Sequence, residues 1–352
     1  MIDPLPFLKS LIPVPGISGF ENPICKSVSD AWRPLVDELS ISRLGSLHGL
    51  CSGTGSQPRH RLMFAAHMDT IGLMVTGMVD GLLRVTAIGG IDPRVLPGQS
   101  VTVHARQDLP AVVVQPPVGL LPPDYKSSPV AIEYLWVDTG LLSTQVTELV
   151  KIGDPISFAQ PAVELTGETL CAPYLDNRAS LAALTICLDE LHGRTHPWDV
   201  WAVASVQEEI GVRGAYTSTF QLHPDIAVAI DVTFARNPGS NDWGTFPLGK
   251  GVTLGWGANI HPALFKKFKE IANLVEIPFE VEVMPYYSGT DGEGMQVTAE
   301  GIPTMVVCIP LRYMHTPVEV VSLKDIRRAG RLMAEFACQL EPDFIEKIIW
   351  DE

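Results

Sequence analysis

The sequence predicts an α/β domain, with helices on both faces of a mixed sheet, that is interrupted by a small all-β insertion. Near both ends of the chain, short apolar runs typical of buried strands alternate with segments of helical period. Between them, the segment 70–167 contains short β-rich runs punctuated by Gly and Pro. We therefore expect residues 1–69 and 168–352 to form the α/β domain and residues 70–167 to form the insertion.

The elements follow this order along the chain. The run Leu62–Ala66 predicts a buried strand that ends at His67, and the insertion contributes short strands at Ser100–His104, Ala111–Val114 and Tyr134–Val137. After it, Asp176–His192 carries four leucines at helical spacing. The remaining expected elements are strands at Val200–Val206, Ile226–Ile230 and Ile302–Ile309, a helix at Pro262–Leu274, and a last helix opened by a capping box at Ser322–Asp325.

Composition excludes several classes of protein. Of the 352 residues 46% are hydrophobic and 18% charged, so the chain can bury a large core and is not disordered. A net charge of −15 disfavours nucleic acid and anionic lipid as partners. No apolar run reaches the roughly 18 residues of a membrane span, and the N-terminus lacks the positive start of a signal peptide. We expect a cytoplasmic protein whose six separated cysteines are reduced and packed as small hydrophobic residues.

Polar motifs stand at or beside the ends of the apolar strands, where an open α/β sheet places its ligands. In His67-Met68-Asp69 the two polar side chains are two positions apart, so on an extended segment Asp69 can hold one imidazole nitrogen while the other binds a metal. A strand-end histidine beside a solvated aspartate is the alternative. Asp176 begins a predicted helix. The ordinary role of an aspartate at that position is to cap the helix, and the alternative is that it binds a metal.

Glu208 and Glu209 directly follow a predicted buried strand. Two adjacent carboxylates there favour a nearby positive charge, unless they lie in a solvated loop. Asp231 closes another apolar run, where it is either a loop cap or a metal ligand. His315 lies in a predicted loop, where it is either a metal ligand or an ordinary surface histidine. Jointly, two His, two Asp and two Glu suit a pair of zinc-class ions about 3.5–4 Å apart.

The order and spelling of seven motifs resemble the M42 family of metallo-aminopeptidases, which includes glutamyl aminopeptidases and the tetrahedral TET peptidases. The segments that carry the resemblance are Pro15–Glu21, Ala66–Gly72, Leu175–Arg178, Gln207–Ala215, Asp231–Thr233, Gly289–Asp291 and Tyr313–Pro317.

The resemblance implies a site with two divalent ions, zinc or cobalt, in each chain. Asp176 would bridge the ions, His67 and Asp231 would complete one site, and Glu209 and His315 would complete the other.

The resemblance also implies a catalytic division of labour. Glu208 would be the general base that activates a water for hydrolysis of N-terminal residues from peptides with a free α-amine. Asp69 would orient His67, and the peptide bond between Asp176 and Asn177 would be cis. The insertion would serve dimerisation, and the dimers would assemble into a hollow tetrahedral dodecamer.

Two loops depart from the family pattern. Gln115 and Val118 flank a Pro pair where relatives often carry Lys and His, and Gly292-Glu293-Gly294 replaces a run of small residues after Asp291. Two other functions stay open. One is an endoglucanase-type glycosidase that uses a carboxylate pair without metal, and the other is a catalytically degenerate assembly scaffold.

Overall fold

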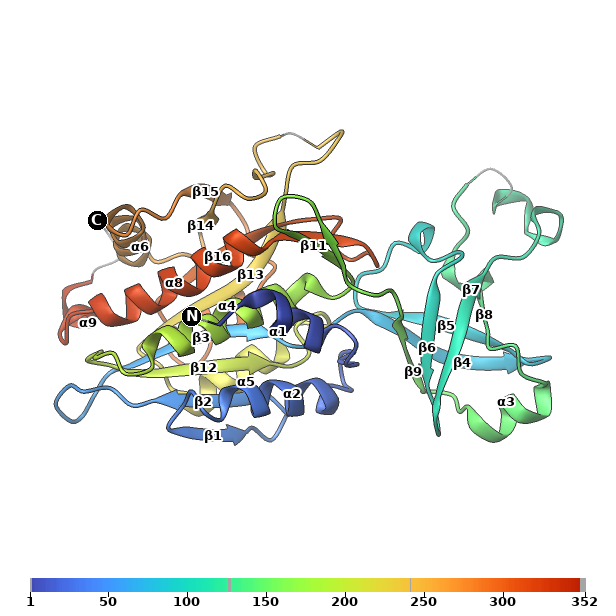
Figure 1. The fold of residues 1–352 in the computed structure, drawn as a ribbon, viewed down its shortest axis with the longest axis horizontal. Coiled ribbons are helices and arrows are strands. Elements are labelled where there is room, and N and C mark those ends of the chain that lie inside the picture. Colours follow the sequence, from blue (N-terminus) through green and yellow to red (C-terminus); the bar gives the residue numbers. More distant parts are fainter. Residues whose placement is uncertain (1, 126–127, 241, 349–352) are drawn as a thin grey trace.

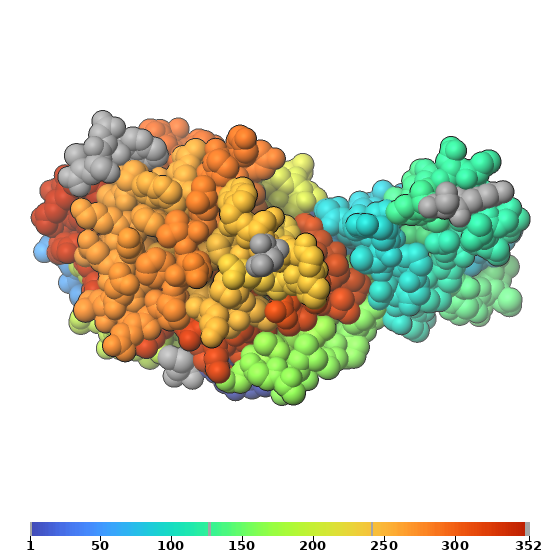
Figure 2. Space-filling view, turned by 90° about the horizontal axis from the view of Figure 1, so that it is seen from above, coloured from blue at the N-terminus to red at the C-terminus, as the bar shows by residue number. Residues whose placement is uncertain are grey.

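A large α/β body and a smaller β barrel lie side by side in the computed structural model, which describes residues 2–125, 128–240 and 242–348 (Figure 1). The same arrangement is seen from above, where the barrel projects from one end of the body (Figure 2). The body is built on one mixed sheet of 11 strands, and the barrel is a closed antiparallel sheet. The predicted fold class, an α/β domain interrupted by a small β unit, is confirmed.

Four adjacent parallel strands form the centre of the large sheet, and they are β12 (Asp199–Ser205), β3 (Arg61–His67), β13 (Ile226–Phe234) and β16 (Thr304–Arg312). Their residues are almost all buried and apolar, as a sheet covered on both faces requires. The flanking strands are β1 (Glu38–Ile41), β2 (Leu47–Cys51), β10 (Val163–Leu165), β11 (Thr169–Ala172), β14 (Val252–Gly257), β15 (Phe279–Met284) and β17 (Glu319–Ser322).

Helices cover both faces of this sheet. On one face α4 (Leu175–Leu191) packs against β3 and β13 and is covered in turn by α8 (Leu323–Gln339), so α4 is buried around nearly its whole circumference (Figure 1). On the other, α5 (Arg213–Leu222) packs with α7 (Asp291–Gln296). The other helices are α1 (Pro4–Leu11), α2 (Asn22–Trp32), α6 (Pro262–Leu274) and α9 (Phe344–Lys347). No helix within the described ranges combines the length and hydrophobicity of a membrane span.

The barrel has its own apolar core and lies within the segment predicted as an insertion. Its strands, in spatial order, are β4 (Gly72–Val79), β5 (Leu82–Ile88), β8 (Trp136–Asp138), β7 (Asp108–Val114), β6 (Ser100–His104) and β9 (Pro155–Phe158). The prediction missed a short helix, α3 (Ser143–Leu149), because a segment that buries Val146 alone shows no helical period. The described part of the chain also contains four single turns of 3-10 helix, η1 (Pro93–Val95), η2 (Val118–Leu120), η3 (Pro123–Tyr125) and η4 (Ile132–Tyr134).

Two further details differ from the prediction. The strand expected to end at Ile230 continues to Phe234, because its last residues pair with Cys308–Leu311 of β16. The capping box expected at Ser322–Asp325 does not form. Ser322 makes no side-chain cap, and the Asp325 carboxylate instead accepts hydrogen bonds from the backbone N–H groups of Gly249 at 2.6 Å and Gly251 at 2.8 Å. All six cysteines are free, and four of them are buried, whereas Cys171 and Cys338 are half-buried.

Candidate active site

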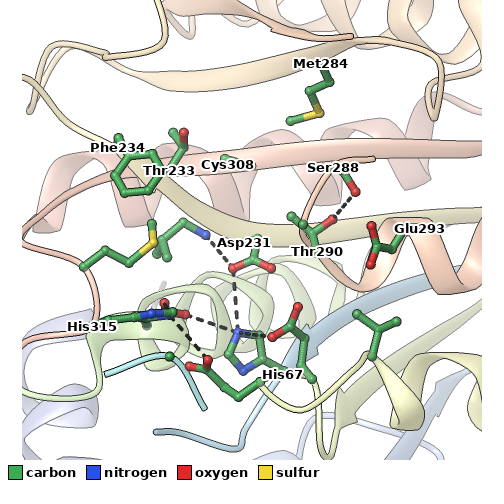
Figure 3. A pocket seen from close by; sticks show the side chains of 18 of the residues that line it. His67, Asp231, Thr233, Phe234, Met284, Ser288, Thr290, Glu293, Cys308 and His315 are labelled. Carbon is green, nitrogen blue, oxygen red and sulfur yellow. Dashed lines mark hydrogen bonds and ion pairs between the residues drawn. The ribbon is translucent and has the colours of Figure 1, made fainter. Parts of the chain in front are cut away.

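A cavity of about 480 Å³ opens at the carboxyl edge of the central parallel strands (Figure 3). Because parallel strands end at one edge of a sheet, residues far apart in the sequence converge there. The five candidate ligands and the candidate base all line this cavity, and they are His67, Asp176, Glu208, Glu209, Asp231 and His315. Gln115 and Val118, the barrel residues that depart from the family pattern, do not line it.

The Asp176 carboxylate lies between two imidazole rings. Its Oδ1 is 3.2 Å from Nε2 of His67, and its Oδ2 is 3.2 Å from Nε2 of His315. One ligand atom each from His67, Asp176 and Glu209 lie within 4.8 Å of one another. A carboxylate that offers one oxygen to each of two neighbouring groups has the arrangement that a bridging ligand requires.

Asp231 lies near the first of these imidazoles and Glu209 near the second. Asp231 Oδ1 is 3.8 Å from Nε2 of His67, and Glu209 Oε2 is 3.4 Å from Nε2 of His315. The site therefore contains two groups of side chains, His67 with Asp231 and His315 with Glu209, that share Asp176.

Local backbone geometry explains how these side chains reach the cavity. At the start of α4 the dihedral angles of Asp176 and Asn177 are not helical, and the peptide bond between them is cis, as the family resemblance implied. Asp176 is not the N-cap, so the capping alternative for this residue is wrong. Asp231 lies inside β13 rather than at its end, and the pairing of Ala229 with Ala65 places it level with His67.

Asp69 acts through two different groups. The Nδ1 of His67 is 3.0 Å from the backbone carbonyl oxygen of Asp69 and 3.7 Å from its carboxylate. The carboxylate instead accepts hydrogen bonds from the backbone N–H groups of Glu208 at 2.9 Å and Glu209 at 3.2 Å, and from the Ser18 hydroxyl at 2.5 Å. The main chain of Asp69 thus holds His67, while its side chain holds the turn that carries the two glutamates.

The site concentrates buried negative charge. Burial and the nearby carboxylates of Asp231 and Asp291 raise the pKa of Glu208 to about 9. Burial likewise raises the pKa of Glu209 and Asp231. Burial alone would lower the pKa of His67, but the surrounding carboxylates raise it well above its ordinary range.

The donor set fits a metal centre. The Glu209 Oε1 is buried and has no hydrogen-bond partner, and the cavity lining includes no Lys or Arg among the described residues. Buried carboxylates without a compensating cation are costly, and divalent ions would supply that charge. Imidazole nitrogen and carboxylate oxygen are ligands suited to ions of the zinc class.

Two supporting carboxylates were missed by the sequence analysis. The buried Glu319 accepts hydrogen bonds from the backbone N–H of Asp176 at 3.0 Å and of His315 at 2.9 Å. Its signal was a single acid inside the apolar run Val318–Val321. Asp291, noted only as part of a motif, accepts a hydrogen bond from the Ser205 hydroxyl, and burial raises its pKa to about 6.

Comparison with known proteins identifies the family of this chain. The family model described as M42 glutamyl aminopeptidase matches residues 45–332. The chain is 37% identical to lysyl aminopeptidase of Pyrococcus furiosus, over 95% of this chain and 97% of that protein.

Solved structures resemble the whole chain. A TET aminopeptidase from a marine sediment Thaumarchaeota archaeon is 29% identical with a TM-score of 0.92, and covers 97% of this chain and 98% of its own. The Pyrococcus horikoshii TET1 peptidase, which can assemble into a tetrahedron or a large octahedral shell, is 28% identical with a TM-score of 0.83, over 96% of this chain and 100% of its own. The chain belongs to the M42 family of aminopeptidases.

Proposed function

We propose that this M42 aminopeptidase is a di-metal hydrolase that removes N-terminal residues from peptides with a free α-amine. The observation that carries the proposal is the Asp176 carboxylate, with one oxygen toward His67 and the other toward His315. His67 and Asp231 would hold one divalent ion and Glu209 and His315 the other, with zinc or cobalt as the metal. When bound, such ions act as Lewis acids toward the scissile carbonyl and lower the pKa of water.

Glu208 is the general base in this proposal. Its carboxylate lines the cavity, and its Oε2 is 3.9 Å from Nε2 of His67, close to the 3.8 Å of the proposed ligand Asp231, so Glu208 lies beside the proposed ligands. Gln207 has a φ of 56°, so the chain turns just before the two glutamates. Glu208 would accept a proton from the attacking water and return it to the leaving amine, which is general acid–base catalysis by one carboxyl group.

A glycosidase function is less well supported by the same cavity. A carboxylate pair that worked without metal would leave the close approach of His67 and His315 to Asp176 without a role. Phe234 is the aromatic side chain among the described residues that line the cavity, which offers little surface for stacking a sugar.

The test uses a panel of chromogenic aminoacyl p-nitroanilides, with and without N-acetylation, after metal removal and after restoration with zinc or cobalt. We expect hydrolysis of free-amine substrates, loss of activity on chelation and recovery on metal addition. Activity that survives complete chelation, or equal turnover of acetylated substrates, contradicts the proposal.

The β barrel would serve assembly rather than catalysis. None of the five proposed ligands lies in the segment 70–167, and the TET1 relative forms closed shells. Assembly of dimers into a tetrahedral dodecamer would admit peptides and exclude folded proteins. Light scattering at micromolar concentration in metal-replete buffer tests this, because a monomer under those conditions rules out the shell.

The names of the relatives do not agree on which N-terminal residue of the substrate is preferred. The family model is described as glutamyl aminopeptidase, whereas the relative from Pyrococcus furiosus is named lysyl aminopeptidase. The preference of this chain has to be argued from its own cavity.

A further inference from the structure

Two carboxylates line the cavity in addition to the proposed ligands and base, and they are Glu282 and Glu293. They come from β15 and α7, which contribute no ligand to the proposed metal centre. The cavity is also lined by Thr233, Phe234, Met284 and Met314, the first three of which are labelled in Figure 3. The wall of the cavity is therefore partly apolar and carries two further carboxyl groups.

Glu282 is held in a fixed position. Its Oε1 accepts a hydrogen bond from the Thr233 hydroxyl at 2.6 Å, and its Oε2 accepts one from the Thr253 hydroxyl at 2.6 Å. Thr233 lies two residues after Asp231 in β13, on the same face of the strand and about 7 Å further along it. Glu282 is thus hydrogen-bonded to a residue one step beyond the proposed ligand Asp231, and the length of that step is comparable with the four-carbon stem and ammonium group of lysine.

Glu293 is the second of these cavity carboxylates. It lies in Gly292-Glu293-Gly294, the departure from the family pattern, and its Oε2 is buried without a hydrogen-bond partner. A Cβ at Gly292 would come within 2.8 Å of Cγ2 of Val306, so this glycine lets α7 pack closely against the sheet. Glu293 lines the cavity, and nothing in the described chain satisfies this acceptor.

Charge balance leaves these two carboxylates uncompensated. In the proposed metal centre, the charges of two divalent ions would be matched by the carboxylates of Asp176, Glu208, Glu209 and Asp231, while the described residues that line the cavity include no Lys or Arg to pair with Glu282 or Glu293. We propose, on the basis of the proposed function, that this cavity selects peptides whose N-terminal residue is basic, lysine or arginine. Glu282 and Glu293 receive the cationic head, and Phe234, Met284 and Met314 contact the methylene stem.

Paired substrates test this charge preference directly. Lysine and norleucine p-nitroanilides have the same four-carbon stem, so the ratio of their kcat/KM values isolates the ammonium group. Arginine and glutamate substrates complete the panel. We expect the native enzyme to prefer lysine over norleucine by roughly 10- to 100-fold, the range for a hydrogen bond to a charged group, and to act poorly on glutamate.

Variants assign the preference to residues. Glu282→Gln should lower the lysine-to-norleucine ratio about tenfold or more by reducing the lysine rate, and Glu293→Gln should lower it in the same direction. Hydrolysis of norleucine substrate and the bound metal content report that each variant is folded. Glu300→Gln removes an exposed carboxylate outside the cavity and should leave the ratio unchanged.

The possible results separate this inference from the proposed function. Norleucine turnover equal to lysine turnover in the native enzyme, or an unchanged ratio in both cavity variants, overturns the basic preference while the aminopeptidase mechanism stands. Failure to hydrolyse any free-amine substrate with metal restored overturns the proposed function and the preference together.

Discussion

The buried carboxylate of Glu319 accepts a hydrogen bond from the backbone N–H of His315 at 2.9 Å. Its other oxygen accepts one from the backbone N–H of Asp176 at 3.0 Å. A single side chain thus ties the turn that carries one proposed ligand to the helix start that carries the bridging ligand. The backbone of Asp176 and of His315 is thus hydrogen-bonded by a residue outside the proposed ligand set.

Glu319→Gln tests this dependence. Glutamine keeps one carbonyl oxygen but turns an amide NH₂ group toward one of the two backbone donors, so one of the hydrogen bonds is lost. We expect metal affinity to fall about 10- to 100-fold, the usual effect of altering a group that supports metal ligands. Competition with a chromogenic chelator measures it. Glu300→Gln is the control at an exposed position. Unchanged metal affinity in Glu319→Gln would show that the metal ligands do not need the hydrogen bonds from Glu319.

Asp69→Asn tests the support of the glutamate turn. The amide cannot accept hydrogen bonds from Ser18 and from the backbone of both Glu208 and Glu209, so the turn should loosen. We expect kcat to fall about 10- to 100-fold together with weaker metal binding, because both glutamates depend on this carboxylate. Ser18→Ala keeps both backbone hydrogen bonds and should cost stability of only about 1 kcal/mol. Equal losses of activity in the two variants would contradict this division.

The sequence predicted the elements with strong periodicity. Pro262–Leu274 is a helix with the expected bounds, and the buried strand that ends at His67 is present. Elements defined by their partners were harder to predict. Asp231 looked like a strand end because it interrupts an apolar run, yet pairing with β16 carries the strand four residues past Ile230. Local pattern contains no information about the length of a partner strand.

The candidate site was predictable as a set of residues but not as a network. Strand ends marked His67 and the two glutamates, because parallel strands bring their carboxyl ends together. Glu319 was missed since its partner Asp176 is 143 residues away in the sequence. The contact between His67 and the Asp69 carbonyl could not be predicted either. The pattern of side chains does not say which atom of a residue faces its neighbour.

Metal removal should make the stability of the protein fall with rising pH. Without metal, the pKa of Glu208 is raised from 4.5 to about 9. Between these values the folded state binds more protons than the unfolded state, so stability is highest at the acidic end and is lost toward pH 9. The raised pKa values of Glu209, Asp231 and His67 act in the same direction.

Thermal melts of chelated and metal-loaded protein measure this effect. They run between about pH 5 and 9, the range between the ordinary and the raised pKa of Glu208. We expect Tm of the chelated protein to fall across this range and the difference between the two forms to widen. Glu208→Gln lacks one of the titrating groups and should show a smaller slope. A chelated protein whose Tm rises with pH would show that these carboxylates are ionised in the metal-free fold.

The last prediction separates the neighbouring glutamates, because the proposed mechanism gives them different tasks. Glu208→Gln keeps size and hydrogen bonding but cannot accept a proton, so kcat should fall by about 10² to 10⁴ while metal content barely changes. Glu209→Gln removes an anionic group 3.4 Å from His315, so one ion should bind more weakly. Its activity should partly return in excess zinc or cobalt. Elemental analysis and steady-state kinetics on both variants measure these effects.

Three outcomes of this pair of variants can be told apart. Loss of turnover with retained metal in Glu208→Gln, and recoverable activity in Glu209→Gln, support a base beside a ligand. Metal loss in Glu208→Gln alone reverses the two roles. Glu208 would then be the metal ligand and Glu209 the general base. Near-normal activity and metal content in both variants would mean that the buried turn held by Asp69 takes no part in the reaction.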